Sequence, residues 1–236
     1  MEHGYISDET DFDQIIWEYE HRDPEKPLFL FNVTIQNHGA YTVKDYPAAV
    51  DLLDEPEKYP MAQQYLTLIN KTEEQFLRLT DYFSQQEEPV LILMFGDHQP
   101  SVEPEFLEKA YGVGTETMSM EEYMNKYRVP FVLWANYPLP ELDKTETSLN
   151  FLSQLLLNCA GLPADSYGQY LQSLQQDLPV LTFAGYMDTL GKAYSHWEST
   201  DFTAMIQDYQ TLQYERLFGT YFNDQAETDP EAAAQP

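Results

Sequence analysis

Basic residues are scarce in this sequence. Only 12 lysines and arginines stand against 40 aspartates and glutamates, so the formal net charge is −28. Such a chain repels nucleic acids and anionic lipid surfaces, because both carry dense negative charge. We therefore expect no nucleic-acid partner and no attraction to anionic lipid. The same acidity disfavours tight capture of a polyanionic substrate, unless a bound metal ion reverses the local charge.

Cysteine and long apolar runs are also nearly absent. The single cysteine, Cys159, cannot form an internal disulfide, and its apolar surroundings predict a small buried residue. No apolar run approaches the ~20 residues that a membrane-spanning helix needs, and the polar start does not resemble a signal peptide. We expect the chain as given to be soluble. Phosphate-binding glycine loops, the Gly-x-Ser-x-Gly elbow and zinc-binding cysteine pairs are missing as well.

Aromatic residues are abundant, with 18 tyrosines and 13 phenylalanines, and they predict a packed core in a chain of 236 residues. Apolar periodicity predicts helices and strands in alternation, which is typical of an α/β fold with a mostly parallel sheet flanked by helices. We expect helices over 7–20, 61–86, 103–111, 119–126, 147–160, 165–177 and 201–218, and strands over 28–35, 90–95, 129–135 and 178–184. Residues 1–222 would form one domain, and 223–236 a disordered acidic tail.

The strand expected over 90–95 is followed at once by Gly96, Asp97 and His98. Side chains alternate between the faces of a strand, so Asp97 and His98 can converge on one ion only where the strand has ended and the chain turns. Gly96 is expected to permit that turn. A second interpretation stays open: Asp97 caps the next segment, and His98 is an ordinary polar loop residue.

A second histidine, His38, follows the strand expected over 28–35 in a similar way. If both strands belong to one parallel sheet, their carboxyl ends meet at the same edge, which is where chemistry collects in open α/β sheets. This arrangement would bring His38, Asp97 and His98 to one crevice. The acids near Ser7, in contrast, have the simplest interpretation of a solvated first helical turn that matches the helix dipole.

Three segments give the chain a resemblance to a known family. Residues 4–14 are similar to a Ser-Asp-Glu helix start, 29–41 to a strand followed by Thr-x-x-Asn-His, and 95–100 to a Gly-Asp-His segment. In this order they resemble the C-terminal part of the catalytic domain of lipoteichoic acid synthase-like phosphoglycerol transferases. These enzymes belong to the sulfatase and alkaline-phosphatase superfamily. The resemblance covers about residues 4 to 160.

The resemblance implies a divalent metal, foremost Mn²⁺, with Zn²⁺ or Mg²⁺ as alternatives. Asp97 and His98 would be metal ligands, and His38 would face the substrate phosphate. In the family, a glutamate and a nucleophilic threonine complete the site, and the threonine forms a covalent phospho-intermediate. The substrate would be a phosphoglycerol or another phosphate ester, or a sulfate ester. The parent protein would work at the extracellular face of a bacterial membrane.

The sequence departs from the family in one large respect, because the segment expected to carry the glutamate and the threonine is missing. Neither Thr10 nor Thr34 matches the nucleophile position. We therefore expect no catalytic nucleophile, incomplete metal ligation or no bound metal, and no activity from this chain alone. A non-catalytic binding domain that keeps the fold is the alternative. An incomplete sheet would also leave an exposed strand edge, through which the chain could self-associate.

Overall fold

The computed structural model describes residues 1–53, 55–142 and 146–219. The predicted tail, 223–236, therefore lies outside the described residues. The elements in chain order are α1 (Asp8–His21), η1 (Pro56–Lys58), α2 (Pro60–Ser84), β1 (Leu91–Phe95), α3 (Pro104–Tyr111), α4 (Met120–Asn125), β2 (Phe131–Ala135), α5 (Leu149–Cys159), α6 (Ser166–Asp177), β3 (Val180–Leu181), β4 (Tyr186–Met187), β5 (Ala193–Tyr194) and α7 (Thr203–Phe218).

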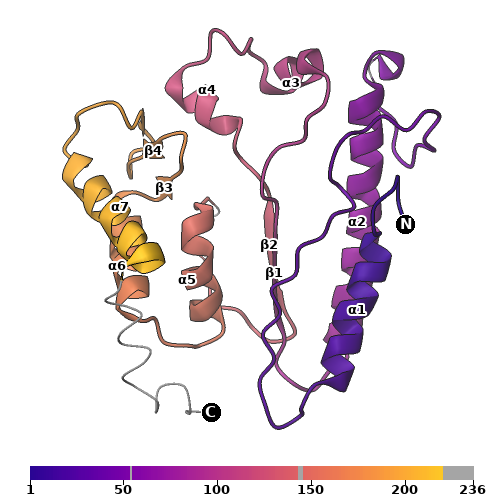
Figure 1. Ribbon diagram of the computed structural model, residues 1–236, viewed down its shortest axis with the longest axis horizontal. Coiled ribbons are helices and arrows are strands. Elements are labelled where there is room, and N and C mark those ends of the chain that lie inside the picture. The colour runs from indigo at the N-terminus through magenta and orange to yellow at the C-terminus, as the bar shows by residue number, and fades with distance from the viewer. Residues whose placement is uncertain (54, 143–145, 220–236) are drawn as a thin grey trace.

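Helices α1 and α2 lie side by side at the N-terminal end of the molecule (Figure 1). Helix α1 begins after Ser7, whose hydroxyl accepts a hydrogen bond from the Thr10 N–H at 3.4 Å and so satisfies one free donor of the first turn. Phe12 of α1 is buried with Leu79 and Phe83 of α2. This apolar contact fixes the helix pair against the strands β1 and β2.

Strands β1 and β2 pair in antiparallel register, with Leu91 opposite Ala135 and Phe95 opposite Phe131. The mixed α/β class is confirmed, but the expected parallel pairing is wrong for the described strands, since all pairs are antiparallel. The chain leaves β1, passes through α3 and α4, and returns so that β2 starts beside the end of β1. Figure 1 places this pair between the N-terminal helices and the C-terminal ones.

The segment 28–35 contradicts the strand prediction. It is extended but joins no sheet among the described residues, and its side chains face solvent. Phe29, Phe31 and Val33 are 76%, 74% and 72% exposed. Alternating aromatic and β-branched residues favour a pleated, half-buried surface. Such a preference is realised only where neighbouring strands cover the segment, and the described residues supply none.

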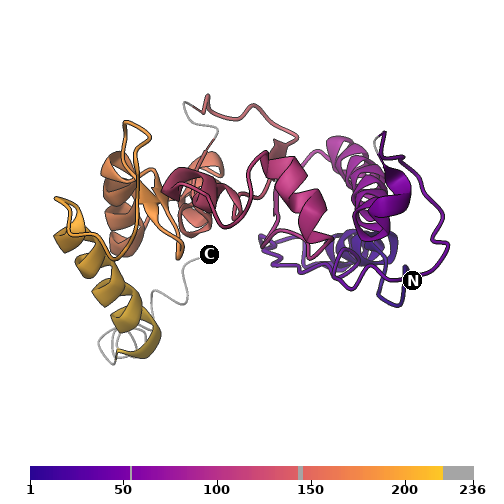
Figure 2. The same cartoon turned by 90° about the horizontal axis from the view of Figure 1, so that it is seen from above.

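The C-terminal part forms its own core, at the end of the molecule opposite α1 and α2 (Figure 2). Helices α5, α6 and α7 surround the short antiparallel sheet β3-β4-β5. The buried core residues are Phe151, Leu171, Leu174, Leu178, Leu181, Tyr186, Ile206 and Tyr209. Cys159 at the end of α5 is buried, as predicted, and burial raises the pKa of its thiol. No helix in the described part of the chain has the length and apolar character needed to cross a bilayer.

Candidate functional site

Asp97 and His98 lie in the turn that follows β1, and both side chains are accessible. Their side chains are 83% and 70% exposed, and the Asp97 Oδ2 atom lies 3.6 Å from the His98 Nε2 atom. That separation is too long for a hydrogen bond. The backbone N–H of His98 donates to Asp97 Oδ1 at 2.9 Å, which holds the carboxylate over the turn. Both expected ligands therefore present their donor atoms side by side.

The geometry of this pair fits a divalent metal. His98 Nδ1 lies 2.9 Å from the backbone carbonyl of Gln99, and a carbonyl can only accept, so Nδ1 carries the proton. The lone pair of a neutral His98 is then on Nε2, the atom nearest Asp97. Bonds of about 2.1 Å at a tetrahedral angle separate two ligand atoms by about 3.4 Å. The observed 3.6 Å comes close to this value.

Gly96 has a role other than the one expected from the sequence. It does not adopt a positive φ angle, so the turn does not require the conformational freedom of glycine. Instead, a Cβ atom at this position would lie 3.2 Å from the Val129 Cβ atom. The Gly96 N–H also donates to the Pro130 carbonyl at 3.1 Å. Gly96 therefore lets the end of β1 approach the start of β2 closely.

His38 lies in the turn after the exposed segment 28–35. Its backbone N–H donates to the Ile35 carbonyl at 3.1 Å, which closes the turn. Its Nδ1 atom lies 2.7 Å from the Gly39 carbonyl and 3.3 Å from the Tyr5 hydroxyl. By the same reasoning as for His98, Nδ1 carries the proton and Nε2 is left to face solvent or a ligand. No local pattern in the sequence predicts that Tyr5 contacts this histidine.

A buried polar network holds the His38 turn against the helix pair. The Thr72 hydroxyl donates to Asp8 Oδ2, and it accepts from the amides of Gln36 at 3.2 Å and Asn37 at 2.8 Å. The interpretation of Asp8 as a solvated acid is wrong, because it is fully buried. Burial raises the pKa of its carboxyl, the Thr72 hydroxyl lowers it, and nearby Asp11 raises it. The Ser-Asp-Glu pattern marks Asp8 as a residue of interest, but it does not predict burial, because an acid in the first turn of a helix is usually exposed.

Tyr41 is buried beside the turn that bears His38. Its hydroxyl donates to the Asn37 carbonyl at 2.7 Å, directly beside His38. Burial, then Tyr65 and then the negative charge of Asp97 raise the pKa of Tyr41 to about 12. The Asp97–His98 pair has no third ligand in the described residues, because no group of three or more His, Cys, Asp or Glu side chains there could hold a metal.

Comparison with known proteins identifies the family and the fold. The chain is 25% identical over 227 residues to a Rhizobium meliloti (strain 1021) protein named as a candidate cyclic beta-1,2-glucan modification protein, which covers 93% of this chain and 35% of the relative. The fold of this chain is similar to that of the Streptococcus pyogenes phosphoglycerol transferase GacH, solved in complex with sn-glycerol-1-phosphate. The TM-score is 0.62 at 18% identity, over 89% of this chain and 48% of GacH.

The chain thus spans about a third of the first protein and about half of the second. The model of the sulfatase family matches residues 1–162, more than half of the sequence, and this range includes both the His38 turn and the Asp97–His98 pair. The chain belongs to the sulfatase family.

Proposed function

We propose that this chain is the C-terminal part of a metal-dependent enzyme that acts on phosphate or sulfate esters at the cell envelope. The observation that carries the proposal is the pairing of Asp97 with the free Nε2 atom of His98, in a chain of the sulfatase family. A carboxylate and a neutral imidazole are ligands that suit Mn²⁺ and Zn²⁺.

Each of the three side chains has a distinct role in this proposal. Asp97 and His98 hold the divalent metal, which when bound would polarise a phosphoryl oxygen as a Lewis acid. His38 directs Nε2 toward the substrate and forms a hydrogen bond with a phosphate oxygen in its protonated form. Tyr5 and the Gly39 carbonyl keep the imidazole of His38 in this orientation, because both contact its Nδ1 atom.

The relatives suggest the chemical class of the reactants. GacH was solved with sn-glycerol-1-phosphate, and the Rhizobium meliloti protein is named for the modification of a cyclic glucan. We infer that the intact enzyme transfers or hydrolyses a phosphoglycerol group, with a carbohydrate as one reactant. No metal-binding group larger than the Asp97–His98 pair is found in the described residues, so this chain by itself is proposed to be inactive.

A non-catalytic binding domain is the second candidate, and the openness of the pair favours it. Dedicated zinc sites generally use three or four protein ligands, whereas here two ligands lie in an exposed turn. Exposed ligands are also hydrated, and this weakens their hold on an ion. A chain that keeps the fold without the complete metal site would then serve to bind a partner or a carbohydrate.

Metal binding tests the role of the pair. We expect Mn²⁺ to bind the chain weakly, and replacement of both ligands in Asp97→Ala/His98→Ala to lower the affinity at least about tenfold. Equilibrium dialysis with metal analysis by mass spectrometry measures this difference. The acidic surface also attracts cations, so the control is Asp13→Ala/His21→Ala, which removes the same charges elsewhere. Equal Mn²⁺ content in all three proteins would refute the site.

Turnover tests the proposed inactivity. We expect the purified chain with Mn²⁺ to hydrolyse a chromogenic phosphodiester no faster than the buffer with Mn²⁺ does, because neither Thr10 nor Thr34 matches the family's nucleophile position. The His98→Ala variant serves as the control. Hydrolysis by the chain above the buffer rate that His98→Ala abolishes would show that these residues form an active site on their own.

We further propose that the exposed segment 28–35 mediates self-association. Its backbone has no ladder partner in the described residues, and Phe29, Phe31 and Val33 project from one side of it. An unpaired apolar edge is a ready template for another strand. A second copy of the chain would supply the same edge, so that two copies pair through identical segments.

A further inference from the structure

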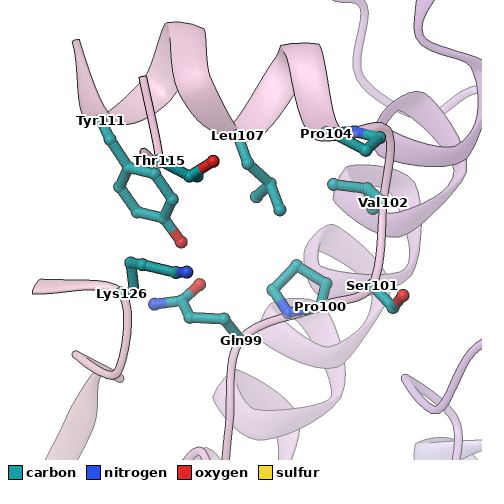
Figure 3. Close-up of a pocket in the computed structure, with 9 residues that line it drawn as sticks. All are labelled: Gln99, Pro100, Ser101, Val102, Pro104, Leu107, Tyr111, Thr115 and Lys126. Carbon is teal, nitrogen blue, oxygen red and sulfur yellow. The ribbon is translucent and has the colours of Figure 1, made fainter. Parts of the chain in front are cut away.

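A pocket opens directly beside the Asp97–His98 turn. It has a volume of about 360 Å³ and is built by the loop that follows His98, helix α3, the residue Thr115 and the end of α4. Figure 3 draws its lining, which consists of Gln99, Pro100, Ser101, Val102, Pro104, Leu107, Tyr111, Thr115 and Lys126. Gln99 adjoins His98 in the chain, so the lining begins one residue after the candidate metal ligands, which do not themselves line the pocket.

Lys126 is the one basic residue of this lining. Eight other lysines and arginines form ion pairs with carboxylates: Arg22, Lys26, Lys58, Lys71, Arg78, Lys109, Arg128 and Arg216. Lys126 has no carboxylate partner among the described residues and lies 5.5 Å from the Tyr123 ring centroid instead. In a chain of net charge −28, an ammonium without a carboxylate at a pocket leaves a place for an external anion.

The rest of the lining has two chemical characters. Figure 3 shows the polar ends of Gln99, Tyr111 and Lys126 pointing toward one another at one end of the pocket. The opposite side is apolar and is formed by Pro100, Val102, Pro104 and Leu107. An ammonium, a phenol and an amide suit an anion and neighbouring hydroxyls, while the apolar side suits C–H groups.

One acidic neighbour limits where the anion can lie. The Glu108 carboxylate accepts hydrogen bonds from the backbone N–H and the hydroxyl of Thr115, both at 3.3 Å. Its charge therefore lies next to Thr115, and an anion in the pocket is favoured at the Lys126 ammonium rather than beside Thr115. Hydroxyl groups, which can donate to a carboxylate, suit the space beside Thr115.

We propose that this pocket binds a phosphorylated polyol or sugar, with its phosphate at Lys126 and its carbon chain against Pro100 and Leu107. The inference rests on the proposed function and deepens it: the pocket would hold the part of the substrate that extends beyond the group at His98. Lys126 and Tyr111 would then select for substrates that carry a second charged or hydroxylated unit.

Titration of the ¹⁵N-labelled chain with sn-glycerol-1-phosphate, without metal, tests the proposal. We expect saturable amide shifts at Gln99, Ser101 and Thr115, with a dissociation constant in the millimolar range. Lys126→Met should weaken this binding about five- to tenfold, since it removes the charge but keeps an apolar stem. Lys44→Met is the matched control, because Lys44 is an exposed lysine outside the pocket.

Three results would overturn the proposal: no saturable shifts, equal weakening by Lys44→Met, or inorganic phosphate binding as well as glycerol phosphate does. The last would mean that the pocket recognises an anion only. A His98→Ala variant separates this inference from the proposed function. If it binds glycerol phosphate normally while Mn²⁺ binding fails in the unmodified chain, the pocket stands and the metal-dependent function falls.

Discussion

Replacement of Thr72 by valine should lower the free energy of unfolding by about 2–4 kcal/mol at pH 8. Valine keeps the shape of threonine but removes the hydroxyl that donates to Asp8 and accepts from Gln36 and Asn37. The variant would leave the buried carboxylate with a weaker set of donors. The Asn37 amide would lose its acceptor, while the Gln36 amide would keep Asp8 and the Leu68 carbonyl. Chemical denaturation followed by circular dichroism measures the change.

The effect should depend on pH in a defined direction. Burial raises the pKa of Asp8 in the folded state, so its contribution to stability is complete below the unfolded-state pKa, near 4, and is lost as the pH rises through the raised value. Without the Thr72 hydroxyl, which lowers the pKa of Asp8, the pKa of Asp8 rises further. The deficit of Thr72→Val should therefore be larger at pH 8 than at pH 5, because the lost hydroxyl stabilises the ionised form of Asp8.

Thr80→Val is the matched control for this experiment. Thr80 is also buried in α2, but its hydroxyl donates only to the Leu77 carbonyl of its own helix, at 3.0 Å. We expect it to cost less than about 1 kcal/mol, without pH dependence. In an Asp8→Asn background, the pH dependence of Thr72→Val should disappear. Equal losses for the two threonines would mean that the network does not hold the His38 turn.

Replacement of Phe31 by lysine should abolish self-association of the chain. Burial of an exposed phenylalanine stabilises a contact by about 1.5–3 kcal/mol, and Phe29 and Val33 flank Phe31 on the same side of the segment. The net charge of −28 on each copy opposes the contact. Because salt screens this repulsion, with a Debye length of about 10 Å at 0.1 M, association of the unmodified chain should strengthen as salt is added.

Sedimentation velocity over a range of NaCl concentrations measures this association. Trp197→Lys is the control, since Trp197 is 96% exposed and lies far along the chain from segment 28–35. It makes a similar aromatic-to-lysine change and should leave the association intact. A monomer at every salt concentration, or the same response from both variants, would show that segment 28–35 is not an interface.

Helices were the predictable part of this fold, because their signals are local. Ser7 caps α1 with its own side chain, and Ser119 forms a capping box with Glu122 at the start of α4. Strand pairing was less predictable. The apolar run at β1 reports a preference for burial, but it does not say which neighbour lies alongside or in which direction. The antiparallel return of β2 and the uncovered segment 28–35 depend on contacts that no local pattern encodes.

The residues of the candidate site also differ in how far the sequence predicts them. Asp97 and His98 were predictable as ligand candidates because their chemistry and their place after a strand are visible in the sequence. The supporting residues were not, because Asp8, Tyr41 and Thr72 act through distant contacts. Thr72 is 64 positions from Asp8. Lys126 was equally hidden, since its lack of a carboxylate partner is a property of the folded surface.

The position of Phe151 has a consequence for how the chain is divided. The match to the sulfatase family model ends at residue 162, yet Phe151 of α5 is buried with Leu171 and Leu174 of α6, beyond that limit. The Asn150 amide likewise donates to the Tyr209 hydroxyl of α7 at 2.9 Å. Residues inside the family-model match thus share a hydrophobic core with residues outside it. The end of that match is not the end of a folding unit, and a protein trimmed at residue 162 would expose this core to water.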